Sequence, residues 1–195
     1  GVFRATVSAL DTDPVPVTVT NFLNQDEYPA LFDGASLTSL IFQALYSEEL
    51  IPLLPDLISD VAADDYALAT RMWSAFFSQG ELLSLGMHLS VQCSEEYVFT
   101  TVDEAEAAAS GLIYGSVIYS DPAGEAALCD LWGRAPLDER ENEAVVSTIP
   151  TLVVSGEFDP ITPPSYGSAT AEGLDAAFEY AYPGLGHGVT SAHEC

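Results

Sequence analysis

The sequence predicts an α/β fold, in which a mostly helical region with one β-hairpin precedes a C-terminal βαβ unit with parallel strands. Three observations lead to this prediction. Apolar residues recur at helical spacing in several segments, and a β-branched alternating run lies at residues 15–20. The continuous apolar run at 151–156 is typical of a strand buried in a parallel sheet. We expect the helical region to cover residues 1–135 and the α/β region to cover residues 136–195.

The expected hairpin lies near the start of the helical region. Residues 15–20 alternate between Val at one position and Pro or Thr at the next, as a strand does, and residues 28–32 would pair with them across a turn. Three prolines, at positions 14, 16 and 29, favour the edge of a sheet, because proline cannot donate a ladder hydrogen bond.

Helices are expected over most of the remaining N-terminal region. Apolar residues at i, i+3 and i+4 begin directly after Asp33 and return in four later segments. The expected helices cover residues 33–45, 50–62, 64–85, 102–111 and 123–132. Residues 87–91 are predicted as a short strand or an extended approach to Cys93.

The C-terminal region alternates between strand and helix. After a polar link at 135–148, strands are expected at 151–156 and 176–182, with a helix at 165–174 between them. A strand, a crossover helix and a second strand form a βαβ unit, whose strands are parallel.

The charge of the chain limits its partners. It has 30 acidic residues, four arginines and no lysine, which gives a formal charge of −26. Binding to nucleic acid depends on neutralising phosphates, so we expect no nucleic-acid partner. Anionic membranes are excluded for the same reason, and no run approaches about 18 uninterrupted apolar residues. No His/Cys cluster has zinc-ligand spacing, so we expect no metal and no cofactor.

Asp159 and His187 are the candidate catalytic residues. Each follows the end of an expected strand, and the carboxyl ends of parallel strands meet at one edge of a sheet. There the carboxylate would accept the Nδ1–H of the imidazole and fix its tautomer, leaving the other nitrogen to deprotonate a nucleophile. Taken singly, Asp159 could be a turn residue and His187 an ordinary loop residue. Their joint order along the chain favours the catalytic interpretation.

Two segments resemble a known family. Residues 150–164 (PTLVVSGEFDPITPP) and 182–188 (YPGLGHG) resemble the C-terminal region of tripeptidyl-aminopeptidase-like (TAP-like) serine hydrolases in the α/β-hydrolase superfamily. Weaker matches extend over nearly the whole chain. The resemblance implies a partial α/β-hydrolase, in which residues up to about 130 form a helical cap and residues 150–195 complete the core sheet. The triad of this superfamily has the chain order Ser, Asp, His, so Asp159 and His187 would be its last two members.

The expected nucleophile is missing. The superfamily carries its serine in Gly-x-Ser-x-Gly, whereas glycines four apart occur here only around Ile113 and Gly186. The most similar segment is the one around Ser165, but no glycine lies two residues before this serine. We interpret Ser165 as a helix N-cap. The chain therefore resembles the second part of such an enzyme, and we expect it to be inactive alone.

The resemblance implies roles for four further residues. Cys93 and Cys129 match a pair that family members often join as a disulfide; the alternative is two buried thiols. A disulfide would place the protein in an oxidising compartment, secreted or at the cell envelope. Glu95 and Glu96 match cap carboxylates that bind the free α-amine of a substrate; the alternative is an exposed acidic pair. Cys195 would remain unpaired or find its partner outside the chain.

Three functions stay open at this point. The leading one is part of a serine aminopeptidase acting on peptides. The second is a non-catalytic binding module that keeps a vestigial Asp–His pair, and the third is an esterase-type hydrolase of small acyl substrates. Two parallel strands without further strands would expose a sheet edge, so we also expect self-association.

Overall fold

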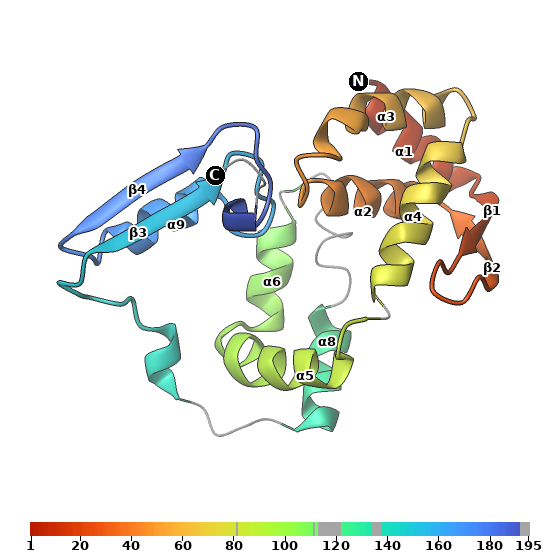
Figure 1. The fold of residues 1–195 in the computed structure, drawn as a ribbon. Helices are drawn as coiled ribbons and strands as arrows, with labels where there is room; N and C mark the ends of the chain where they lie inside the picture. Colours follow the sequence, from red (N-terminus) through yellow and green to blue (C-terminus); the bar gives the residue numbers. More distant parts are fainter. Residues whose placement is uncertain (81, 111, 113–121, 134–137, 192–195) are drawn as a thin grey trace. The chain divides into compact units, whose positions relative to one another are not determined.

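The computed structural model describes residues 1–80, 82–110, 112, 122–133 and 138–191 of the chain, and Figure 1 shows the order of their helices and strands. The chain divides into two compact units. The first combines Gly1–Val17, Leu31–Met72 and Ala144–Cys195, and the second combines Thr18–Ala30 and Trp73–Glu143. The division into domains at residues 135 and 136 stays a prediction.

Three helices form the N-terminal part of the first unit. They are α1 (Val2–Thr12), α2 (Gly34–Ala44) and α3 (Leu54–Ala62), and the short 3₁₀ turn η1 (Ile51–Leu53) leads into α3. Helix α1 packs against both α2 and α3. Where α1 meets α2, the Gly34 amide donates to Asp11 Oδ1 at 3.0 Å, and a Cβ on Gly34 would collide with α1. The absence of a side chain at Gly34 therefore allows close packing of these helices.

Local sequence explains where these helices begin. The helix predicted from residue 33 is confirmed as α2, because Asp33 Oδ1 accepts the backbone N–H of Ser36 at 2.8 Å and caps its first turn. Helix α1 was not predicted. Its N-cap is Gly1, which offers no capping side chain, so the usual start signal is absent. It nevertheless buries Val7 and Leu10 at helical spacing.

The predicted hairpin is confirmed as β1 (Val15–Thr20) and β2 (Glu27–Phe32). Its tip lies in the second unit, beside the C-terminal half of α4 (Ala67–Gly80). The backbone N–H groups of Thr20 and Phe22 donate to the hydroxyls of Ser74 and Ser78, at 3.0 and 2.8 Å. Two buried serines one turn apart on α4 thus satisfy backbone donors at the end of β1.

A disulfide ties the helices of the second unit together. This unit continues with α5 (Leu85–Val91), the π turn η2 (Gln92–Glu96), the 3₁₀ turn η3 (Tyr97–Phe99), α6 (Val102–Ala109) and α8 (Pro122–Trp132). Cys93 in η2 and Cys129 in α8 are joined by an S–S bond of 2.05 Å, and both are buried. The predicted pairing is thus present, and it links two helical segments that are 36 residues apart.

The prediction for residues 64–91 was partly wrong. The expected helix 64–85 ends at Gly80, and the segment predicted as a strand is helix α5. Ser84 starts that new helix, because its Oγ accepts the backbone N–H of Met87 at 3.4 Å. Val91 is the only β-branched residue of α5, so the segment has little intrinsic preference for a strand.

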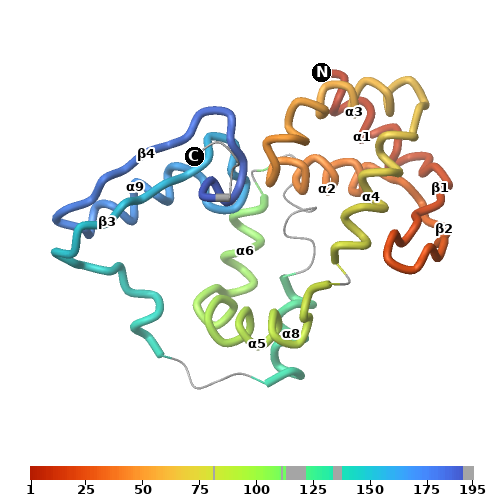
Figure 2. Tube along the Cα trace, in the orientation of Figure 1, coloured from red at the N-terminus to blue at the C-terminus, as the bar shows by residue number. Residues whose placement is uncertain are grey.

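The C-terminal βαβ unit is confirmed. It consists of β3 (Thr151–Gly156), α9 (Pro164–Ala171) and β4 (Ala177–Tyr182), preceded by η4 (Glu139–Asn142) and followed by η5 (Val189–Ser191). The strands are parallel and lie side by side (Figure 2), with Thr151 opposite Ala177 and Gly156 opposite Tyr182. The fold class is therefore α/β, with a hairpin, several helices and a small parallel sheet, in agreement with a partial α/β-hydrolase.

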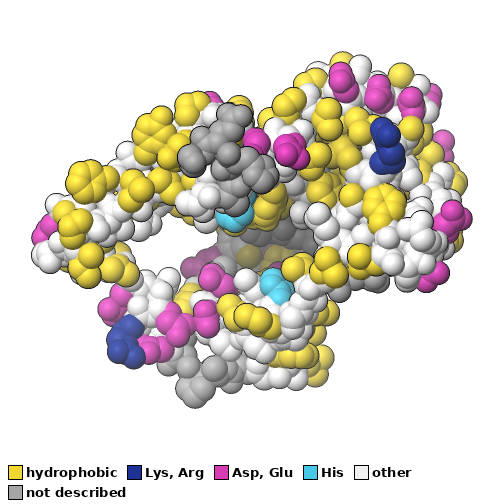
Figure 3. Space-filling model, viewed as in Figure 1, with side chains coloured by type: hydrophobic (Ala, Val, Ile, Leu, Met, Phe, Trp, Pro, Cys, Tyr) yellow, Lys and Arg dark blue, Asp and Glu magenta, His cyan; other side chains and the backbone are white. Residues whose placement is uncertain are grey.

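Helix α9 covers one face of this small sheet. Gly167 of α9 packs against Ser155 and Val153. The opposite face carries apolar side chains that are largely exposed, namely Leu152 (66%), Phe178 (64%) and Tyr180 (53%). Apolar side chains are correspondingly prominent in this part of the surface (Figure 3, left).

Acidic side chains are spread over the visible surface in Figure 3 instead of forming one patch. This dispersal agrees with a solvated, self-repelling surface. Among the described helices, none has both the length and the apolar character needed to cross a bilayer.

Loss of the disulfide is expected to destabilise the chain. Replacing Cys93 and Cys129 together by Ala removes a cross-link over about 37 residues, which lowers the free energy of unfolding by about 4 kcal/mol through the unfolded-state entropy. Urea unfolding with and without dithiothreitol measures the effect. Reductant should lower the stability of the native chain and leave the double variant unchanged. Equal sensitivity of both proteins to reductant would contradict a stabilising disulfide.

We propose that copies of the chain associate through the β3–β4 sheet. Within the described residues each strand of this sheet has one edge without a partner strand, and the face opposite α9 is apolar. Light scattering should show association that increases with salt, because salt screens the repulsion between acidic surfaces. Phe178→Ser should weaken it, whereas the control Leu131→Ser, at an exposed leucine in α8, should not. A monodisperse monomer at high salt would contradict the proposed association.

Candidate active site

The candidate active site lies at the carboxyl ends of β3 and β4, where both strands continue into loops held by backbone hydrogen bonds. The N–H of Glu157 donates to the carbonyl of Tyr182 at 3.0 Å, and the N–H of Phe158 donates to the carbonyl of Leu185 at 2.9 Å. A Cβ on Gly156 would collide with the backbone of Gly186. The parallel pairing therefore continues beyond the strands and brings the two loops into direct contact.

Glycines shape the loop that carries His187. Gly184 and Gly188 have φ angles of +75° and +79°, in the region that other residues rarely adopt. The N–H of Gly184 also donates to Glu157 Oε2 at 2.9 Å, which joins this loop to the Asp159 loop. The sequence Gly184-Leu185-Gly186-His187-Gly188 thus allows a sharp turn directly after β4.

Asp159 and His187 meet in this arrangement, as predicted. His187 Nδ1 lies 3.1 Å from Oδ1 and 3.0 Å from Oδ2 of Asp159. The side chain of Asp159 is only 3% exposed, whereas that of His187 is 38% exposed. Because an ionised carboxylate can only accept, Nδ1 must carry the proton that it donates. Among the described residues Nε2 has no hydrogen-bond partner, so it is the nitrogen available to an external group.

Three further donors hold the Asp159 carboxylate. The N–H groups of Ile161 and Thr162 donate to Oδ1 at 2.9 and 2.8 Å, and the Thr162 hydroxyl donates to Oδ2 at 2.8 Å. Burial alone would raise the pKa of Asp159, but the hydrogen bonds from Thr162, Ile161 and His187 outweigh burial and lower it below the ordinary value. Asp159 is therefore ionised at neutral pH. It remains ionised when the pH falls into the range in which an ordinary aspartate begins to take up a proton.

Thr162 is a functional candidate that the sequence analysis missed. It lies three residues after Asp159, and its Oγ1 is also 3.5 Å from His187 Nδ1. The available signal was the turn Asp159-Pro160-Ile161-Thr162, because an Asp side chain that precedes a turn commonly accepts N–H groups two and three residues later.

A small cavity of about 180 Å³ adjoins the pair. Ser155 and Gly156 of β3 line it together with Gly188, Val189 and Thr190. This volume is below that of typical ligand pockets. On its own, the cavity has room for the reacting atoms of a substrate and not for a whole peptide.

Among the residues that the structure describes, no serine of the expected Gly-x-Ser-x-Gly kind lies at this pair. Ser165 is exposed and lies inside α9, whose N-cap is Pro163. The interpretation of Ser165 as an N-cap is therefore wrong, because Pro163 already occupies the position before the helix. The segment around Ile113, and Cys195, lie outside the described residues.

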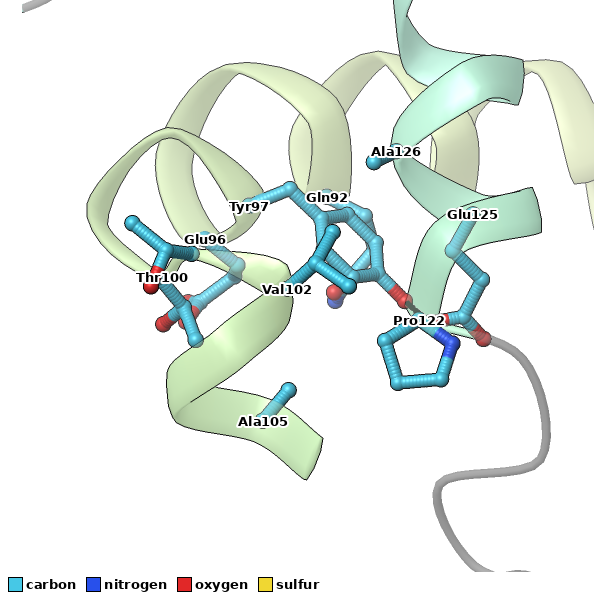
Figure 4. Close-up of a pocket in the computed structure, with 10 residues that line it drawn as sticks. Gln92, Glu96, Tyr97, Thr100, Val102, Ala105, Pro122, Glu125 and Ala126 are labelled. Atoms are coloured by element: carbon cyan, nitrogen blue, oxygen red, sulfur yellow. Dashed lines mark hydrogen bonds between the residues drawn. The ribbon is translucent and has the colours of Figure 1, made fainter. Parts of the chain in front are cut away.

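Of the two predicted amine-binding residues, Glu96 lines a pocket and Glu95 does not. The pocket lies within the second unit and has a volume of about 300 Å³. Its lining is mixed, with apolar side chains of α6 and α8 beside polar ones such as Gln92 and Thr100 (Figure 4). Glu96 and Glu125 lie on opposite sides of it, with Tyr97 and Val102 between them. Both Glu95 and Glu96 are exposed to solvent, so the pocket lining is what distinguishes them.

The two carboxylates of this pocket differ in their partners. The Tyr97 hydroxyl donates to Glu125 Oε2 in a short hydrogen bond. Burial and this hydrogen bond raise the pKa of Tyr97 to about 12, so the phenol stays neutral over the whole range near neutral pH. Glu96 makes no hydrogen bond or ion pair to the described residues. Its carboxylate is therefore the one free to accept a ligand.

No group of three or more His, Cys, Asp or Glu residues that could hold a metal ion occurs in the described part of the chain.

Comparison with known proteins identifies the region that contains the Asp159–His187 pair. Residues 116–195 match the family model described as TAP-like protein. No curated protein and no solved structure matches the chain. The matched region includes β3, α9, β4 and Cys129, whereas Cys93, Glu95 and Glu96 precede it. The C-terminal part of the chain, which carries the Asp159–His187 pair, is therefore similar to TAP-like proteins of the α/β-hydrolase type.

Proposed function

We propose that this chain supplies the acid and base of a serine hydrolase. The observation that carries the proposal is the contact of His187 Nδ1 with both carboxylate oxygens of Asp159. A buried, ionised carboxylate on one ring nitrogen, with the other nitrogen accessible, is the arrangement that a general base requires.

The proton path follows from this geometry. Nε2 of His187 takes the proton of a serine hydroxyl as that oxygen attacks the acyl carbon, and it later delivers the proton to the leaving group. The imidazolium formed in between is stabilised by Asp159, whose charge is already held by Thr162 and Ile161. Asp159 itself does not need to take up a proton.

The serine is proposed to come from a segment outside these 195 residues. The printed sequence has no Gly-x-Ser-x-Gly, and Ser165 makes no described contact with His187. The chain alone should therefore bind substrate without hydrolysing it. The full-length product of its gene should carry the hydrolase activity.

An aminopeptidase is the favoured type of hydrolase. Glu96 offers an unpartnered carboxylate to a pocket lined by both apolar and polar side chains, and a protonated α-amine would form a charge-assisted hydrogen bond with it. The substrate would then be a peptide with a free N-terminus. The Cys93–Cys129 disulfide supports a secreted or cell-envelope location, since such bonds persist in oxidising compartments.

The catalytic proposal predicts that Asp159→Asn lowers kcat of the full-length protein by about 10⁴-fold, because the wrong imidazole tautomer then faces the serine. Hydrolysis of aminoacyl and tripeptidyl chromogenic amides measures it. His187→Gln should be equally impaired, and the control Ser165→Ala should keep full activity. Absence of hydrolysis in the unmodified full-length protein would favour a binding module with a vestigial pair, and equal loss in Ser165→Ala would make Ser165 the nucleophile.

The substrate proposal predicts that Glu96→Gln raises KM about 10- to 100-fold for substrates with a free α-amine, because a hydrogen bond to a charged group is lost. N-acetylated substrates and simple esters should be unaffected. The matched control is Glu95→Gln, which changes the neighbouring exposed carboxylate outside the pocket. Preference of the unmodified enzyme for acetylated esters over free-amine peptides would instead indicate an esterase.

A further inference from the structure

We infer that Tyr46 is a positioning residue for His187, and that its ring holds the imidazole with Nδ1 directed at Asp159. The inference rests on the proposed role of His187 as a general base. Tyr46 follows helix α2, far from His187 in the sequence and outside the region that matches the family model.

The first observation is direct contact between the two rings. The centroids of Tyr46 and His187 are 5.3 Å apart, and the ring planes meet at 64°. This is the edge-to-face geometry that aromatic pairs prefer. The ring of Tyr46 therefore occupies one side of the imidazole while Asp159 occupies the Nδ1 edge.

The second observation is that Tyr46 is itself held in place. Its N–H donates to the carbonyl of Gln43 at 3.2 Å, which continues the last turn of α2. Its ring also packs edge to face against Phe42, one helical turn earlier, with centroids 5.9 Å apart. A side chain fixed at both backbone and ring can act as a rigid support.

The third observation is backbone packing between the two segments. Gly186, the residue before His187, is buried against Leu45 and Tyr46, and a Cβ at this position would collide with their backbone. The glycines that shape the His187 loop leave it few side chains to fix its conformation. The end of α2 provides the missing constraint.

Electrostatics agree with this placement. Burial, and after it the negative charge of Asp159, raise the pKa of Tyr46 above its ordinary value. The phenol is therefore neutral beside the ionised carboxylate, and it does not compete with His187 for a proton. Tyr46 thus interacts with both members of the pair: its ring contacts His187, and the charge of Asp159 shifts its pKa.

The test is a long-range ¹H–¹⁵N NMR spectrum of the histidines in the 195-residue chain, with His187→Gln to assign the signals. The unmodified chain should show His187 mainly as the Nδ1–H tautomer. Tyr46→Ala should lower the ratio of Nδ1–H to Nε2–H several-fold, because the ring can then rotate away from Asp159. Tyr46→Phe should keep the native ratio, since the ring and not the hydroxyl makes the contact.

Tyr66→Ala is the matched control. Tyr66 lies in the same unit and makes a similar edge contact, to Phe32 with centroids 5.8 Å apart. If Tyr46→Ala does not fold, Tyr46→Leu replaces it, because leucine keeps apolar bulk and removes the ring. An unchanged tautomer ratio in whichever of these variants folds would overturn the inference, and so would an equal change in Tyr66→Ala or a change in Tyr46→Phe. This test needs no turnover, so a native tautomer in an inactive full-length protein would refute the proposed function and leave the positioning intact.

Discussion

The parallel pairing of β3 with β4 is the interaction on which the candidate site depends. Its register places Gly156 opposite Tyr182, so both strands end at the same level and their loops leave the sheet together. Hydrogen bonds from Glu157 and Phe158 then continue the pairing into the loops. Asp159 and His187 meet because of this backbone arrangement. A register shift of one residue would move a strand's side chains to the other face and separate the pair.

The buried charge of Asp159 is stabilised without lysine or arginine. In a chain with 30 acidic and four basic residues, a buried carboxylate has few cationic partners available. Two backbone N–H groups and one hydroxyl stabilise the carboxylate by hydrogen bonds instead, and all three come from the turn that Asp159 itself begins. The imidazolium of His187 would be the natural counter-charge during catalysis.

The sequence predicted most elements whose signals are local, and it predicted the contact of Asp159 with His187. The hairpin, α2, α8 and the βαβ unit all carry clear periodicity or capping residues. Helix α1 and the restart of the helix at Ser84 were missed, because one lacks a capping side chain and the other depends on a single serine. Tyr46 and Thr162 could not be recognised as partners of the pair from periodicity alone. Tyr46 reaches His187 only through the tertiary packing of Gly186 against α2.

The Cys93–Cys129 bond has a consequence for how the chain responds to proteases. It connects η2, which precedes the family-matched region, with α8 inside that region. A single cut of the backbone between the two cysteines would therefore leave both pieces covalently attached. Such a nicked protein would migrate as one species until a reductant separates it into two. Outside the cell, where reductants are scarce, cleavage at that point need not release the part that carries Asp159 and His187.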